Sequence, residues 1–172
     1  MDAADRPVLI AYDGSPAARQ AVVDVAKILR PGRTLVVTVW EAGLAYATPA
    51  MPPDGMTMTP MVDPATALSV DRDIHQHAEV VSRDGAALAT SLGLDAEPLA
   101  VPDDGSVSET ILNLARSHDA AAIVVGSRGL TGLKSMLLGS VSHGVLHHAD
   151  RPVIVVPSST VVARRAAHGH RR

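Results

Sequence analysis

The sequence predicts one α/β domain of three layers, built on a five-stranded, mostly parallel sheet. Short apolar, β-branched runs alternate with segments of helical periodicity, which is the pattern of parallel strands joined by crossover helices. The chain of 172 residues is long enough for one such domain. Although 47% of it is hydrophobic, it contains no Phe, one Trp and two Tyr. The core must therefore consist of Val, Leu, Ile and Ala, as in buried parallel strands flanked by Ala-rich helices.

The first 40 residues read as strand, helix and strand. Residues 7–12 are a continuous apolar run of the buried-strand type. Residues 15–29 carry apolar side chains at helical spacing, with Ser15 as a capping residue and Pro16 at the first helical position. Residues 34–40 are again apolar and β-branched, so we expect a second strand there.

The middle of the chain contains an unusual insertion. Residues 43–64 are rich in Pro, Met, Thr and Ala, carry few charges and have no steady period, so we expect a long exposed loop or lid. Residues 64–92 have the pattern of a long helix that ends at Gly93. Residues 94–101 form a third strand that Pro98 interrupts, which favours a position near the sheet edge.

The last third repeats the alternation twice. A helix capped by Ser106 or Ser108 precedes a strand at 120–125, and a second helix at 139–148 precedes a strand at 153–156. Residues 158–172 form a basic tail, which we expect to be disordered. This element order predicts a Rossmann-like, doubly wound sheet over residues 7–157, in which ligands bind beyond the carboxyl ends of the strands.

Composition excludes several classes of function. A formal charge of −3 and scarce aromatic residues argue against a nucleic-acid partner. The absence of cysteine removes disulfides, thiolate nucleophiles and thiolate metal sites. The acidic N-terminus is no signal peptide, and no apolar run is long enough to span a membrane. We therefore expect a soluble, cytoplasmic protein without a membrane partner.

A glycine-rich segment follows the fourth predicted strand. Its spacing is Gly126-x2-Gly129-x9-Gly139-Ser140, and a helix begins near the last glycine. Glycines let backbone N–H groups approach an anion, and a helix N-terminus adds unpaired donors, so the segment predicts a phosphate site. An ordinary flexible connection is the alternative. Neither the Walker signature nor the dinucleotide fingerprint is present.

Other polar residues allow both a functional and a structural interpretation. Asp13 follows the first strand and is either a turn residue or an acceptor for ribose hydroxyls. Trp40 follows the second predicted strand. It either lies near the base of a bound nucleotide or fills the apolar space under the loop that follows. Ser142 and His143 are adjacent and diverge on a helix, so they do not form a hydrolase pair. His143 and His147 lack a partner carboxylate at helical spacing, so we expect them to face solvent.

Three segments together resemble the universal stress protein family. They are Val8-Leu-Ile-Ala-Tyr-Asp13-Gly-Ser15, the glycine segment, and Asp150-Arg-Pro152-Val-Ile-Val-Val156. The resemblance covers roughly residues 7–157. Because the glycine segment marks the ATP-binding branch of that family, the resemblance implies that this chain binds ATP. It also implies a homodimer formed through the last strand, residues 153–156.

The resemblance also implies a role for each matching position. Asp13 would contact the ribose and a magnesium ion, and the backbone of Val39 would contact the edge of adenine. The residues that line the ribose and phosphate path would be Gly126, Arg128 and Gly129. The residues that hold the phosphates would be Gly139, Ser140, Val141 and Ser142.

The sequence thus predicts an ATP-binding sensor or regulator of the stress response. No side chain is placed as a catalytic residue, so hydrolysis of ATP would be slow at most. The alternative is a dimeric protein-interaction module with a vestigial nucleotide site, in which the methionine-rich loop is the working surface. The sequence does not distinguish ATP from other adenine nucleotides.

Overall fold

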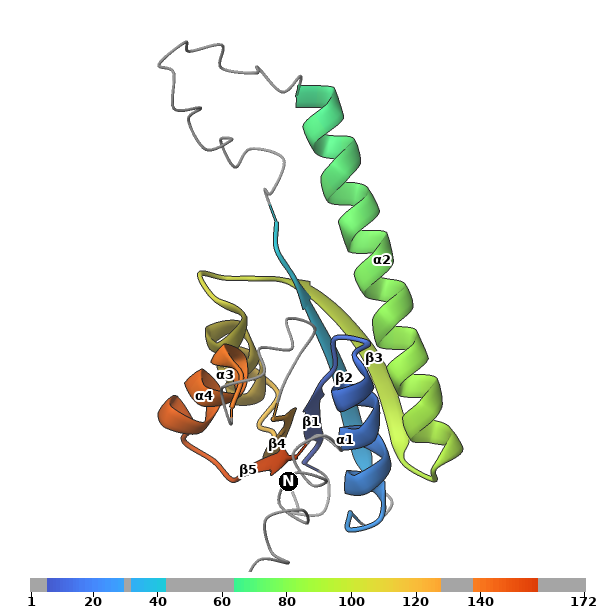
Figure 1. The fold of residues 1–172 in the computed structure, drawn as a ribbon, viewed down its shortest axis with the longest axis vertical. Helices are drawn as coiled ribbons and strands as arrows, with labels where there is room; N and C mark the ends of the chain where they lie inside the picture. The colour runs from blue at the N-terminus through green and yellow to red at the C-terminus, as the bar shows by residue number, and fades with distance from the viewer. Residues whose placement is uncertain (1–5, 30–31, 43–63, 128–137, 158–172) are drawn as a thin grey trace, which may run out of the picture.

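The computed structural model describes residues 6–29, 32–42, 64–127 and 138–157 (Figure 1). Five parallel strands lie in the order β3-β2-β1-β4-β5, with helices on both faces, which confirms the predicted α/β class. In chain order the elements are β1 (Val8–Ala11), α1 (Pro16–Ala26), β2 (Arg33–Trp40), α2 (Pro64–Ser91), β3 (Asp95–Pro102), α3 (Val107–Ser117), β4 (Ala122–Gly126), α4 (Ser140–His148) and β5 (Val153–Val156). The predicted loop or lid at 43–63 and the predicted tail at 158–172 lie outside the described residues, and Pro64 begins α2.

The two faces of the sheet bury separate apolar clusters. Helices α1 and α2 pack on one face, where Ile10 and Val36 are fully buried. Helices α3 and α4 pack on the other face, where Leu9 and Val37 are buried. Successive residues of a strand point to opposite faces, so β1 and β2 supply both clusters. The predicted three layers are therefore present (Figure 1).

Side-chain caps decide where two helices begin. The Ser15 hydroxyl accepts the Ala18 N–H at 3.1 Å, as the sequence predicts. Of the two serines considered for α3, Ser106 is the cap, since its hydroxyl accepts the Glu109 N–H at 3.2 Å. Helix α1 ends at Ala26, not at Leu29, because the N–H groups of Lys27 and Ile28 bond three residues back in a tighter turn.

The longest helix, α2, lies along β2 and β3. Its 28 residues span about 42 Å, so its N-terminal part extends past the sheet (Figure 1). Strand β3 lies at the edge, as Pro98 predicts, because proline lacks the N–H that an inner strand needs on both sides. Within the described residues, no helix is both long and apolar enough to cross a membrane.

The sheet order creates a topological switch point between β1 and β4. The chain leaves β1 for α1 on one face and leaves β4 for α4 on the other face. The two connections therefore diverge at the carboxyl edge of the sheet and leave a crevice between them. In doubly wound folds ligands bind in this crevice.

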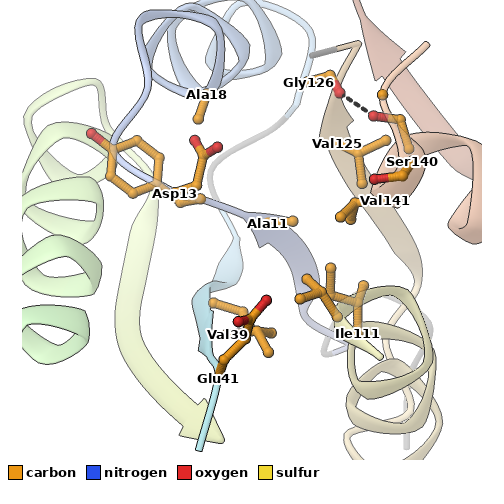
Figure 2. A pocket seen from close by; sticks show the side chains of 15 residues that line it. Ala11, Asp13, Ala18, Val39, Glu41, Ile111, Val125, Gly126, Ser140 and Val141 are labelled. Atoms are coloured by element: carbon orange, nitrogen blue, oxygen red, sulfur yellow. Dashed lines mark hydrogen bonds between the residues drawn. The ribbon is translucent and has the colours of Figure 1, made fainter. Parts of the chain in front are cut away.

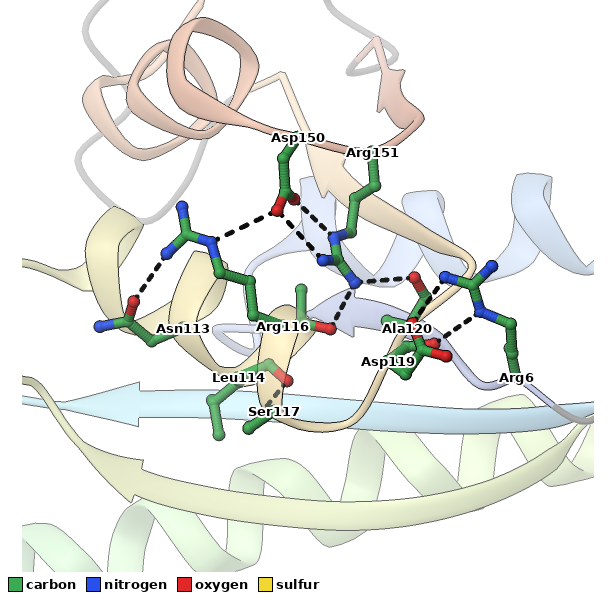
Figure 3. A network of polar contacts seen from close by, with 10 residues as sticks. Arg6, Asn113, Leu114, Arg116, Ser117, Asp119, Ala120, Asp150 and Arg151 are labelled. Atoms are coloured by element: carbon green, nitrogen blue, oxygen red, sulfur yellow. Dashed lines mark hydrogen bonds and ion pairs between the residues drawn. The ribbon is translucent and has the colours of Figure 1, made fainter. Parts of the chain in front are cut away.

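A polar network lies at the amino ends of the strands, opposite the crevice (Figure 3). The Arg151 guanidinium is 12% exposed and donates to the carbonyls of Ala115 at 2.5 Å and Ala120 at 2.9 Å. It also pairs with Asp150 at 2.8 Å, and Asp150 lies 3.4 Å from Arg116. Hydrogen bonds from Arg151 hold the pKa of the Asp150 carboxyl at about 2. These contacts connect the end of α3 to the segments that enter β4 and β5.

Arg151→Met should destabilise the protein by about 2 kcal/mol, because two buried carbonyls lose a charged donor. Urea unfolding at neutral pH measures this loss. Arg151→Lys should recover little of the lost stability, because one ammonium cannot bond both carbonyls and Asp150 as the planar guanidinium does. The folded pKa of Asp150 lies below its ordinary value, so its contribution is present above pH 4 and lost as the pH falls toward 2. A wild-type unfolding midpoint in Arg151→Met would contradict this role.

Candidate functional site

A pocket of about 320 Å³ opens at the switch point, at the carboxyl ends of β1, β2 and β4 (Figure 2). The first turns of α3 and α4 close its other side. Seven residues that the sequence singles out lie together in its lining: Asp13, Val39, Gly126, Gly139, Ser140, Val141 and Ser142. Arg128 and Gly129, the two others, lie outside the described residues.

Asp13 makes the turn from β1 into α1 and also lines the pocket. Its Oδ1 accepts the Ser15 N–H at 3.0 Å, and Gly14 between them has a φ of +75° that favours glycine. The side chain is half-buried and faces Ser140 across the pocket (Figure 2). The turn interpretation of Asp13 is therefore confirmed, and its position allows the second role as well.

The N-terminus of α4 forms one wall of the pocket. Gly139 is the N-cap, with φ −71° and ψ 162°, and it provides no side-chain cap. The N–H groups of Ser140, Val141 and Ser142 form the first helical turn, where backbone donors have no partner within the helix. The positive end of the helix dipole lies at the same place. This wall can therefore bind an anion through its backbone.

Two hydrogen bonds attach this helix to the end of β4. The Gly139 N–H donates to the Ser127 carbonyl at 2.8 Å, and the buried Ser142 hydroxyl donates to the Gly126 carbonyl at 2.6 Å. The hydroxyl proton of Ser142 is thus committed to the protein. A phosphate contact through this hydroxyl does not fit the structure, which leaves the backbone N–H of Ser142 as its donor for an anion.

An apolar wall lies between the end of β2 and helix α3. Val37 and Val39 line it from β2, and Val107 and Ile111 line it from α3. Figure 2 shows Val39 and Ile111 on its two sides. Val107, Ile111 and Glu41 are lining residues that were not predicted from the sequence. The signal for Glu41 was available, because residues 37, 39 and 41 share one face of a strand. The α3 side chains carried no local signal, since only the packing of α3 on the sheet brings them to the pocket.

The described lining has a negative charge. Its two ionisable carboxylates are Asp13 and Glu41, and none of its described members is Lys, Arg or His. Tyr12 also lines the pocket, and burial raises the pKa of its hydroxyl, with Asp84 and Asp13 adding to the rise against Arg19. Among the described residues, no group of three or more His, Asp or Glu side chains could hold a metal ion.

Trp40 lies outside the described lining of the pocket. It alternates with Val39 along β2, and its ring centre lies 5.3 Å from that of His75 on α2. The indole is therefore part of the contact between β2 and α2. Strand alternation separates the two neighbours although they are adjacent in sequence.

Comparison with known proteins gives one consistent result. The family model described as "Universal stress protein family" matches residues 6–157. The universal stress protein YxiE of Bacillus subtilis is 31% identical over 160 residues, which cover 87% of this chain and 97% of that protein.

Solved structures of low sequence identity share the fold. UspA from Lactobacillus plantarum has a TM-score of 0.67 at 20% identity and covers 90% of this chain and 99% of its own. A universal stress protein in complex with cAMP has a TM-score of 0.58 at 21% identity, covering 91% and 99%. A family protein from Arabidopsis thaliana with AMP bound has a TM-score of 0.57 at 16% identity, covering 91% and 94%.

Proposed function

Since the chain belongs to the universal stress protein family, we propose that its pocket binds an adenine nucleotide, with ATP as the preferred ligand. The observation that supports this most is the order of chemical groups along the carboxyl edge. An apolar wall lies at β2, a carboxylate at β1, and an uncapped helix N-terminus beyond β4. A nucleotide presents base, ribose and phosphate in the same order. Two family members in the comparison were solved with cAMP and AMP.

In this proposal each part of the pocket has one task. The apolar wall accepts the base, whose edge bonds to the backbone of Val39. Asp13 accepts from the ribose hydroxyls. The N–H groups of the first α4 turn hold the phosphates. Gly126, together with Arg128 and Gly129, lines the path between ribose and phosphates.

A magnesium ion fits the charge balance of this proposal. Asp13 and Glu41 make the described lining negative, and ATP adds further negative charge. A divalent cation shared between Asp13 and phosphate oxygens would offset that repulsion, and Mg²⁺ is commonly bound by one or two carboxylates plus phosphates. Removal of magnesium with EDTA should then weaken binding of ATP more than binding of adenosine.

The proposed role is that of a sensor or regulator in a stress response, not of a fast enzyme. No described side chain in the pocket is a histidine, and the half-buried Asp13 already accepts a backbone N–H. Backbone donors and a magnesium ion can stabilise charge on a phosphate without activating a water. Turnover of ATP should therefore stay below about one per second.

The test is direct measurement of ligand identity and affinity. Protein purified from cells and then denatured should release adenine nucleotide, identified by mass spectrometry. Calorimetry with Mg²⁺ should show micromolar binding of ATP, with ADP, AMP and cAMP compared under the same conditions. Titrations that give no heat and no thermal stabilisation with any of them would refute the proposal.

The second candidate is a dimeric interaction module, and the exposed edge of β5 favours it. Val153, Ile154 and Val155 are only half-buried, and no described strand pairs with the outer side of β5. Such an edge can pair with a second copy of the chain. A homodimer is compatible with both candidates, and light scattering measures it. A dimer that binds no nucleotide would favour the interaction module.

A further inference from the structure

The solvent face of α4 carries a cluster of histidines outside the pocket. His143, His147 and His148 are exposed, and none of them lines the pocket. We propose that His143 and His147 form a bidentate site for a divalent transition-metal ion. This proposal is independent of the nucleotide proposed above.

The helix holds the two imidazoles at a suitable separation. His143 and His147 are four residues apart on α4, so they lie on the same face one turn apart. Their ring centres are 5.8 Å apart, with the planes at 66°. Metal–nitrogen bonds of about 2.0 Å put the centres of two rings on one ion roughly 5 Å apart. Small side-chain rotations would therefore bring both rings onto one ion.

The third histidine, His148, follows His147 on the helix, and their ring centres are 5.2 Å apart. Adjacent residues on a helix leave the axis in different directions, whereas residues four apart share one face, so helix geometry favours His143 as the partner of His147. Ion pairs do not engage His143 or His147 in the described structure, where the one histidine ion pair is that of His75 with Glu79. Both imidazoles of the proposed pair are thus exposed and outside the ion pairs of the described residues.

The donor set selects the class of metal. Two neutral imidazoles suit Cu²⁺, Ni²⁺ or Zn²⁺, whereas Mg²⁺ and Ca²⁺ require oxygen ligands. Since the described residues offer no third His, Asp or Glu in range, water would fill the remaining positions. Such a site exchanges its metal readily and differs in chemistry from the magnesium proposed at Asp13.

The experiment titrates the full chain with CuCl₂ and NiCl₂ in the absence of nucleotide. The wild type should bind one metal ion at this site, and the electron paramagnetic resonance spectrum of bound Cu²⁺ should show two nitrogen ligands. His143→Ala and His147→Ala should each weaken binding about tenfold or more, as expected for loss of half the protein ligands. Neither change disturbs the fold, because both side chains are exposed and alanine favours helix.

Matched variants separate this site from other histidines. His77→Ala, on the exposed face of α2, and His148→Ala should keep the wild-type affinity and spectrum. A double variant, His168→Ala with His170→Ala, removes the two histidines near the C-terminus and should also keep them. Loss of metal affinity when His148, His168 or His170 is replaced would overturn the assignment. So would metal affinity that remains when both His143 and His147 are replaced.

Discussion

Gly139→Asp should abolish high-affinity nucleotide binding while the protein stays folded. Gly139 has an extended N-cap conformation that aspartate adopts readily, so the helix can form as before. The new carboxylate would accept the N–H groups of the first α4 turn, which are the donors proposed for phosphate. It would also place a negative charge at the end of the helix dipole. We expect affinity for ATP to fall by about 100-fold or more, as for a loss of about 3 kcal/mol, measured by calorimetry.

Two control variants test the reason for this loss. Gly139→Ser competes for the same donors without charge and should weaken ATP binding less than aspartate does. Ser140→Ala leaves the backbone donors unchanged and should alter affinity by less than tenfold. The thermal midpoint without ligand should not fall in Gly139→Asp. Equal ATP affinity in wild type and Gly139→Asp would show that the phosphates do not bind at α4.

Gly85→Val should destabilise the protein by overpacking the contact between α2 and Tyr12. A Cβ at Gly85 would lie 2.7 Å from Cδ1 and 2.9 Å from Cγ of Tyr12. The Tyr12 ring is 2% exposed and packs between the sheet and α2, and Cγ and Cδ1 lie at the base of the ring, where a rotation of the side chain moves them little. Overpacking of this kind costs about 1–3 kcal/mol. The unfolding midpoint should fall by about 2–12 °C, since a domain of this size loses roughly 2–4 °C per kcal/mol.

Ala87→Val is the matched control, because Ala87 lies two residues further along α2 and is exposed. It introduces the same β-branched side chain into the same helix, so it should cost only a few tenths of a kcal/mol. Gly85→Val should also weaken nucleotide binding, because Tyr12 precedes Asp13 and lines the pocket. Equal midpoints for the two variants would show that Tyr12 can move out of the way.

Much of the site could be predicted because its signals are local. Strand ends, the turn at Asp13 and the glycine spacing are short-range features, and parallel topology brings all strand carboxyl ends to one edge. What short segments left open is side-chain direction. They did not show that the Ser142 hydroxyl bonds to the Gly126 carbonyl, or that the Trp40 ring lies beside His75 on α2. Their directions depend on which face of the sheet α4 and α2 cover, which no short segment specifies.

The sequence by itself determined the alternation of strands and helices, the edge position of β3, and the group of residues at the switch point. These follow from periodicity, proline chemistry and caps, which act over a few residues. Only the tertiary structure decided that Glu41 and Ile111 complete the pocket, that the Ser142 hydroxyl bonds α4 to the end of β4, and that a side chain at Gly85 would meet Tyr12. Each of these depends on the close approach of elements far apart in the chain, where dense packing leaves no room for another arrangement of the side chains.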